Sequence, residues 1–283
     1  MRNHFLRAAA GNVSGAPNIV TTNLVQHFDF GDTNSYNTSV STTTITDLSG
    51  AGNHAFFLNA PTFSTSNGGY IQPTASNQYA QKGTPTGAGS AANQSFMRSI
   101  GTGNYTIEIW MNIFGQGGSQ DPAYQDTTQE VSFSPTFSFN FYYHNLAQHL
   151  NFRLGSQGHE GSTNIYNINI TNGTSTANVP VITIDPSNHY TSGYNGWEQF
   201  VVSRTSTSTN GLKYYRNNSL LRTSTNSINY VIPQIGGGVT DVVHYFKNID
   251  SRYAIFRFYK GHGLTATEVD QNYQAQKARF GLS

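Results

Sequence analysis

The carboxylates are the first residues of this sequence to consider as a source of chemistry. Hydrolysis of a glycosidic bond needs two carboxyl groups close together, one protonated and one charged. The chain has five glutamates, at positions 108, 130, 160, 198 and 268. Glu108 lies in the segment TIEIWMNI, in which no second acidic residue follows it. The spacing therefore predicts no catalytic carboxylate pair, and we expect the chain to have no catalytic residue.

Glu108 and Trp110 are two residues apart, so on a β-strand their side chains lie on the same face. A tryptophan beside a carboxylate could form a platform for a sugar ring, which makes these two the candidate ligand-binding residues. The alternative is structural, with Trp110 packed under a loop or against a second sheet. The spacing fits both interpretations, and the structural one is the simpler.

Histidines provide a second candidate cluster, near Glu160. His144, His149 and His159 lie in one region, but the spacing from His144 to His149 fits neither one face of a helix nor one face of a strand. We therefore expect surface or packed histidines and no metal site here. The chain has no cysteine, which excludes disulfides and thiolate metal sites. The glycines of GGGV at 236–239 lack the lysine and the helix of a phosphate-binding loop.

Charge and hydropathy limit the kinds of partner. Charged residues make up 10% of the 283 residues, and the formal net charge is +1, so the chain is not expected to gather nucleic acid or anionic lipid. The first residues lack the apolar run of a signal peptide, and no segment approaches the length of a transmembrane helix. We therefore expect no nucleic-acid or membrane partner. For a role outside the cell, release by lysis inside an assembled particle would be one route.

Most of the chain consists of short strand-like segments separated by Gly, Ser, Thr and Asn. LVQHFDF, FSPTFSFNFYY and YTIEIWMNI alternate in polarity, and the last is typical of a half-buried strand. WEQFVVSR is a further strand, and LKYYRNNSLLRT predicts a hairpin with Asn217 and Asn218 at its turn. RYAIFRFYK is apolar on both faces, which suits a central strand. This pattern favours a sandwich or jelly roll.

The final segment, GLTATEVDQNYQAQKARFGLS, has a different pattern. Thr265 and Glu268 form a capping box, and Val269, Tyr273 and Phe280 follow at helical spacing. We therefore predict one amphipathic C-terminal helix that docks on the sandwich through these three apolar residues.

The first residues, 1–20, contain glycines and a proline but no sustained periodicity. We expect an extended arm there, followed by one domain over 21–283. Because no period would bury the apolar side chains of the arm on one face, we predict an assembly element that contacts another subunit or another protein. Its candidate contact residues are Arg2, Phe5, Leu6 and Arg7.

Two low-complexity segments, 82–103 and 155–195, interrupt the strand pattern. Both predict long loops. Long loops in compact domains tend to carry function or to contact partners.

Four segments, in this order, resemble a laminin-G-like, concanavalin A-like lectin/glucanase jelly roll of the kind found in structural proteins of tailed phages, notably marine ones. The first runs from LVQHFDF to SNQYAQ and includes the turn DLSGAGN, and the second is YTIEIWMNI. The third is GWEQFVVSR with the following hairpin, and the last is RYAIFRFYK with the closing helix. The chain departs from the pattern at Ile45, where many relatives have Trp, and at Asn218, where they have Gly.

The resemblance implies an all-β fold: a concanavalin A-like (laminin-G-like) antiparallel β-sandwich jelly roll with a short C-terminal α-helix and an extended N-terminal arm. It implies a non-enzymatic phage virion protein, a head decoration or fibre or a tail-associated protein, whose partners are other virion proteins and further copies of itself, for example in a trimer. The first alternative is a carbohydrate-binding adhesion module for host-surface polysaccharide. The second is a glycan depolymerase. Lichenase-type relatives carry Glu-x-Asp-x-x-Glu on one strand, and this sequence lacks the second and third acidic residues of that motif after Glu108, which disfavours a depolymerase.

The resemblance also implies a candidate calcium site. Laminin-G-like domains sometimes hold calcium through aspartates and backbone oxygens at a loop rim. Asp29, Asp32 and Asp47 are the candidate ligands, and no other cofactor is expected. Asp47, in TDLSGAGN, is explained more simply as an Asx-type turn former.

Overall fold

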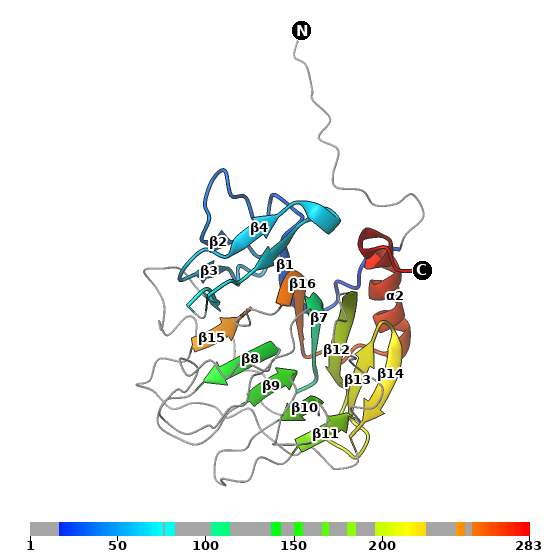
Figure 1. Cartoon of the computed structure of the whole chain (residues 1–283). Helices are drawn as coiled ribbons and strands as arrows, with labels where there is room; N and C mark the ends of the chain where they lie inside the picture. Colours follow the sequence, from blue (N-terminus) through cyan, green and yellow to red (C-terminus); the bar gives the residue numbers. More distant parts are fainter. Residues whose placement is uncertain are drawn as a thin grey trace, which may run out of the picture.

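The computed structural model describes residues 17–75, 77–82, 103–113, 137–142, 150–154, 166–169, 180–184, 196–224, 242–246 and 251–283 (Figure 1). Every strand pair within these residues is antiparallel. The predicted all-β antiparallel sandwich with a short C-terminal helix is confirmed.

The strands form two sheets and a separate pair. The larger sheet contains, in spatial order, β14 (Ser219–Thr223), β13 (Leu212–Arg216), β12 (Trp197–Arg204), β7 (Tyr105–Ile113), β16 (Ser251–Lys260), β5 (Tyr70–Gln72) and β4 (Thr62–Ser64), and β1 (Leu24–Asp29) also pairs with β16. The smaller sheet contains β2 (Thr44–Ile45), β3 (Ala55–Phe57), β6 (Ala80–Lys82), β15 (Val242–Tyr245), β8 (Phe137–Tyr142) and β9 (Leu150–Leu154). The separate pair is β10 (Tyr166–Asn169) and β11 (Pro180–Ile184). The helical segments are η1 (Ser66–Gly68), α2 (Ala266–Gln276) and η4 (Lys277–Phe280).

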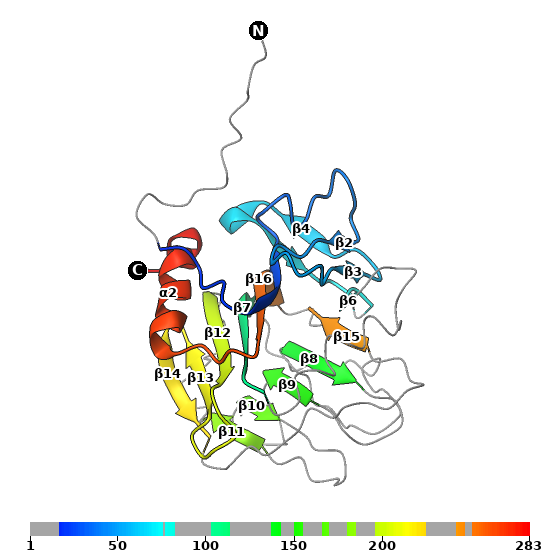
Figure 2. The same cartoon turned by 180° about the vertical axis from the view of Figure 1, so that it is seen from behind.

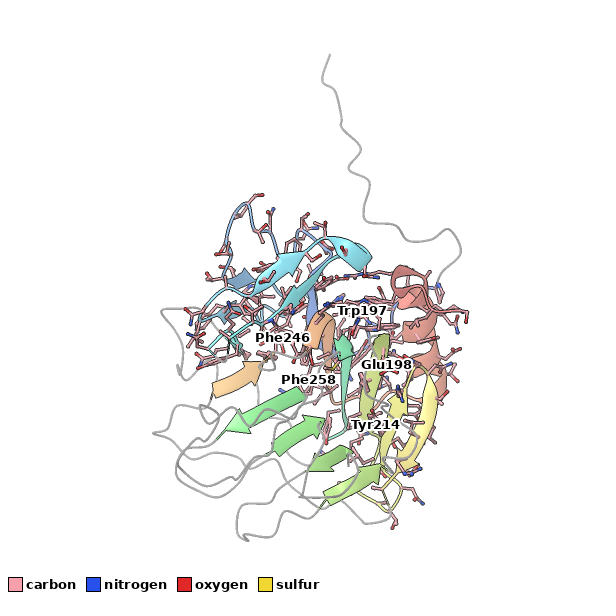
Figure 3. The ribbon with its side chains drawn as sticks, in the orientation of Figure 1. Trp197, Glu198, Tyr214, Phe246 and Phe258 are labelled. Atoms are coloured by element: carbon pink, nitrogen blue, oxygen red, sulfur yellow. The ribbon has the colours of Figure 1, made fainter. Side chains whose placement is uncertain are left out.

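Aromatic side chains fill the space between the two sheets. Phe28 of β1 and Phe256 of β16 are fully buried, and their ring centroids lie 5.6 and 5.3 Å from that of Tyr245, on β15 of the other sheet. Phe246 and Phe258, labelled in Figure 3, belong to the same core. Removing each ring from water contributes about 2 kcal/mol to folding. The core therefore holds the two sheets face to face.

Strand β7 differs from the half-buried strand predicted, because both of its faces are buried. The register places Glu108 opposite Val201 of β12 and Arg257 of β16, on the outer face of the larger sheet. The C-terminal helix covers this face on the side of β12 and β13 (Figures 1 and 2). Alternation along the strand defines its two faces, but it does not reveal that a distant helix covers the polar one.

Helix α2 begins at the predicted capping box. The backbone N–H of Thr265 donates to Glu268 Oε2 at 2.8 Å, and the backbone N–H of Glu268 donates to Thr265 Oγ1 at 3.3 Å. Val269, Tyr273 and Phe280 are all buried, which confirms the predicted docking face. The helix is therefore part of the core of the domain.

The predicted hairpin turn at Asn217 and Asn218 is also confirmed. Both residues have positive φ, 45° and 66°, a conformation that asparagine tolerates better than other non-glycine residues. The Asn218 side chain donates to Asp270 Oδ1 at 2.7 Å. The turn between β13 and β14 is thereby attached to helix α2.

The long loop predicted over 155–195 is wrong in part, because β10 and β11 lie within it and pair with each other. The sequence of β11, PVITI, is rich in β-branched residues and carries a strand signal, which the polar residues around it obscured. Residues 83–102 of the other predicted loop lie outside the described residues, as do the histidine cluster and Arg2, Phe5, Leu6 and Arg7 of the arm. At the end of the predicted arm, Val20 is buried against the domain.

Candidate functional site

Glu108 lies at the centre of the outer face of the larger sheet, beneath α2, and is 0% exposed. Its Oε1 accepts three hydrogen bonds: from Arg257 Nη1 at 2.8 Å, Gln199 Nε2 at 3.0 Å and Trp110 Nε1 at 3.1 Å. The register of β12, β7 and β16 brings these side chains to one face. One carboxylate oxygen therefore joins three neighbouring side chains of the sheet.

The other oxygen of Glu108 connects the sheet to the helix. Asn272 of α2 donates to Glu108 Oε2 at 2.7 Å and to the hydroxyl of Tyr259 at 2.9 Å. Asn272 Oδ1 in turn accepts the backbone N–H of Val20 at 2.7 Å, and the Tyr259 hydroxyl donates to the Val20 carbonyl at 3.1 Å. Burial raises the pKa of Tyr259, so its hydroxyl keeps its proton. One buried network thus joins the sheet, the helix and residue 20.

The ion pair between Glu108 and Arg257 is removed from water on both sides. Removing two ions from water costs several kcal/mol each, which attraction and additional hydrogen bonds must offset. His27 lies beside this pair, with its Nε2 3.4 Å from Arg257 Nε. Burial and the positive charges of Arg257 and Arg279 hold the pKa of His27 well below its usual range. His27 is therefore neutral near neutral pH and does not compete with Arg257 for Glu108.

Trp110 packs against the C-terminal helical segments. Its ring is stacked on Tyr273 and Phe280, at centroid distances of 5.8 and 4.7 Å. Trp110 therefore packs inside the protein, as the structural interpretation expected. Its partners are the C-terminal helical segments and not a loop or the second sheet. Neither Trp110 nor Glu108 reaches solvent, so a ligand would contact them only if the helix moved away.

The other described glutamates also have basic partners. Glu198, labelled in Figure 3, pairs with Arg216, and Glu268 contacts His262 Nε2 at 2.8 Å. In the register, Glu198 lies opposite Met111 and therefore on the other face of the sheet from Glu108. Within the described part of the chain, no two glutamates share one face of the larger sheet.

The three candidate calcium ligands each make other contacts. Asp29 accepts two hydrogen bonds from Arg279 Nη1, at 2.7 and 2.9 Å. Asp32 accepts the backbone N–H of Asn34, and Asp47 accepts the backbone N–H of Ser49, which confirms the predicted Asx-type turn. Among the residues that the structure describes, no three His, Asp or Glu side chains are grouped so as to hold a metal ion. Calcium binding stays a prediction.

One cluster of side chains was not predicted from the sequence. At one end of the outer face, Asn112 of β7 lies in register between Trp197 of β12 and Arg252 of β16. The ring of Tyr70, on β5, lies 5.6 Å from that of Trp197 and 5.5 Å from the Arg252 guanidinium carbon. We call Tyr70, Gln72, Trp197 and Arg252 the Tyr70–Arg252 patch. No sequence signal could have found it, because three separate strands supply its members.

No helix in the described ranges is long and apolar enough to cross a membrane. The sequence matches no protein-family model, and no match was found among curated proteins. The similarities that were found come from comparison of the structure with solved structures.

Several solved structures have the same fold. The receptor-binding domain of botulinum neurotoxin C/D mosaic serotype superimposes with a TM-score of 0.56 and 12% identity, over 93% of this chain and 55% of that one. The ligand-binding domain of botulinum neurotoxin serotype D, solved with N-acetylneuraminic acid, gives 0.55 and 12%, over 93% and 55%. The binding domain of Paraclostridial mosquitocidal protein 1 gives 0.51 and 12%, over 89% and 52%.

At 12% identity these similarities establish the fold alone, which is a lectin-like β-sandwich. The chain spans 52–55% of the length of these three structures, so each of them has a substantial part without a counterpart here. All three are binding domains. None of the three is a phage protein, so they do not support the phage relationship expected from the sequence.

Proposed function

We propose that this chain is a non-catalytic, lectin-like binding domain of a phage virion, and that it attaches the particle to polysaccharide on the host surface. The observation that carries the binding role is the fold match over 89–93% of the chain to three binding domains, one of which is a receptor-binding domain. One of these was solved with an acidic sugar, N-acetylneuraminic acid. Attachment to a surface glycan is the role that fits these relatives and this fold best.

The contacts of the described glutamates support a role without catalysis. A hydrolase would need a carboxylic acid and a carboxylate facing the same sugar. Glu108 is enclosed beneath α2 and paired with Arg257, and Glu198 faces the other side of the sheet. Among the residues that the structure describes, neither has beside it the exposed second carboxylate that a glycosidase requires.

The virion part of the proposal rests on the order of the four sequence segments and on the low charge of the chain. Its partners would be other virion proteins, a host glycan and further copies of the chain. Antibodies raised against the purified protein should label particles released by lysis of the producing cell. Labelling of the cells alone, with unlabelled particles, would contradict a virion location.

The binding role is tested with the purified chain on a panel of bacterial and algal polysaccharides. We expect saturable binding to at least one of them and no release of reducing ends over long incubation. Turnover of any polysaccharide, retained after a second purification step, would show an enzyme instead. Failure to bind any polysaccharide of the panel would contradict the proposed adhesion role.

A further inference from the structure

We infer that the surface between α2 and β14 is the docking site for the N-terminal arm of a neighbouring copy of this chain. On this surface the contact residues are Leu220 of β14 and Asp270 of α2. The incoming arm would supply Phe5, Leu6 and Arg7. The inference deepens the partner part of the proposed function, since it names the surface that would hold a further copy. It does not depend on which glycan the domain binds.

Leu220 is a large apolar side chain at the surface. It is 50% exposed, and it lies directly opposite Tyr215 in the pairing of β13 with β14. Residues directly opposite each other share one face of a sheet. Tyr215 is buried with Val269 of α2, so Leu220 lies on the outer face of the larger sheet, next to the helix (Figures 1 and 2). A single exposed leucine is ordinary in a folded protein, so the inference depends on the carboxylate beside it.

Asp270 holds that carboxylate in a fixed orientation. Its Oδ1 accepts hydrogen bonds from Asn218 at 2.7 Å and from Gln274 at 2.9 Å, and Asn218 lies in the turn that leads into β14. Among the residues that the structure describes, no lysine, arginine or histidine pairs with Asp270, and its Oδ2 accepts no hydrogen bond. The side chain is partly exposed. An oriented carboxylate without a cation is suited to receive an arginine from another chain.

The arm has the complementary side chains. Its segment FLR, at 5–7, places two large apolar residues directly before Arg7. An apolar side chain of this segment would cover Leu220, while the guanidinium of Arg7 would pair with Asp270. The order of apolar and charged groups in the arm thus matches their order across the surface.

The arm begins at the helix that carries Asp270. Gln271 Nε2 donates to the carbonyl of Asn18 at 2.7 Å, so residues 1–16, which lie outside the described residues, continue from a point fixed on α2. When fully extended, the chain from Asn18 to Arg7 spans about 40 Å. An arm of this length can reach the same surface of a neighbouring copy.

The competing occupant is the chain's own arm. Because Asn18 is bound to Gln271, next to Asp270 in the helix, docking within one chain would require residues 8–17 to turn back as a compact loop. Their sequence, AAAGNVSGAP, has Val13 as its one large apolar residue, which offers little to hold such a loop together. Closing and ordering a loop costs conformational entropy. An arm that crosses to a neighbouring copy needs no such loop.

The first experiment measures the mass of the full chain by sedimentation over a range of concentrations. We expect association, and Asp270→Asn and Leu220→Ser should each weaken it by about tenfold or more, since a charge-assisted hydrogen bond or an apolar contact is lost. Asparagine keeps an oxygen for the two local hydrogen bonds. Asp32→Asn and Val40→Ser are the matched controls, because they make the same changes at a partly exposed aspartate and an exposed valine between β1 and β2. Thermal unfolding shows whether each variant keeps its fold.

The second experiment uses the absence of cysteine from the chain. One variant carries Ala8→Cys in the arm, another carries Leu220→Cys on the surface, and the two have tags of different size. A disulfide needs the two Cβ atoms about 4 Å apart, so a mixed disulfide after mild oxidation requires the arm of one copy to lie on the surface of another. Ala8→Cys mixed with Val40→Cys is the control, and this pair should stay unlinked.

A full chain that stays monomeric at every concentration would overturn the inference. Association that is unchanged in both Asp270→Asn and Leu220→Ser would overturn it as well, as would association without any mixed disulfide. If one chain carrying both Ala8→Cys and Leu220→Cys forms only an internal disulfide, the occupant is its own arm and the exchange between copies is wrong. Glycan binding is measured separately with the polysaccharide panel, so failure of the inference leaves that part of the proposed function standing.

Discussion

Replacing Glu108 by glutamine tests whether the buried network stabilises the domain. The side chain keeps its size, but Arg257 loses its counter-charge in a position that water does not reach. Glutamine can direct its oxygen to only one side of the network. If that oxygen faces the three donors of the sheet, its amide nitrogen faces Asn272 Nδ2, which is also a donor.

The expected loss of stability follows from this arrangement. Breaking a buried ion pair by removing one partner costs about 3–5 kcal/mol, because the remaining charge is uncompensated. Domains of this size have total stabilities of about 5–15 kcal/mol, so the substitution should remove a large part of the total. The melting temperature should fall by about 10 °C.

Urea unfolding followed by tryptophan fluorescence is a suitable assay. The chain has two tryptophans, Trp110 and Trp197, and both lie on the outer face of the larger sheet. The double variant Glu108→Gln/Arg257→Met removes both charges and should be more stable than Glu108→Gln alone. Glu268→Gln is the control at a partly exposed carboxylate that contacts His262, with an expected cost of about 1 kcal/mol or less.

A loss of less than about 1 kcal/mol in Glu108→Gln would refute this reasoning, because such a value is typical of an exposed pair. A double variant no more stable than the single one would also refute it. In that case the loss of stability would come from the lost hydrogen bonds of Glu108 and not from the uncompensated charge of Arg257.

Three further predictions concern the ends of the chain. Tyr273→Asp should destabilise the domain by at least about 3 kcal/mol, and an unchanged melting temperature would show that α2 is not part of the core. Burial raises the pKa of Glu268, but hydrogen bonds from Thr265 and His262 outweigh this and lower it overall. Its contribution to stability should therefore be present above about pH 4.3 and be lost as the pH falls further, and Glu268→Gln should lack this part of the pH dependence. The arm was predicted over residues 1–20, but Val20 is buried against the domain, so the deletion is limited to residues 2–16. This deletion should leave the unfolding temperature nearly unchanged while abolishing oligomerisation or incorporation into particles, and normal assembly would contradict a role for the arm.

The elements that the sequence predicted correctly have local signals. The strand at β16, the hairpin turn at Asn217 and the capping box at Thr265 each depend on residues within a few positions of one another. The covering of β7 by α2 has no such signal. Packing was one of the two interpretations of Trp110, but its partner Tyr273 lies far along the chain and could not be named from the sequence.

The buried network could not be predicted for the same reason. Glu108 bonds to residues 91, 149 and 164 positions away. Arg257, a cation within the apolar stretch YAIFRFY at 253–259, is the signal that a buried partner existed. It does not identify Glu108, because only the pairing of β7 with β16 places the two side chains together.

Strand β16 has a consequence for how the protein is made. It pairs with β7, β1 and β5, yet its residues, Ser251–Lys260, leave the ribosome well after those of all three strands. Until then β7 and β1 have emerged without the strand that lies between them. The backbone N–H of Val20 also lacks its hydrogen-bond acceptor, Asn272, which lies 252 residues further along the chain. Pairing over such separations is slow, and uncovered strands associate readily with other chains. The nascent chain should therefore depend on holding chaperones until β16 has been made, and ribosome-bound chains that stop before Ser251 should be protease-sensitive.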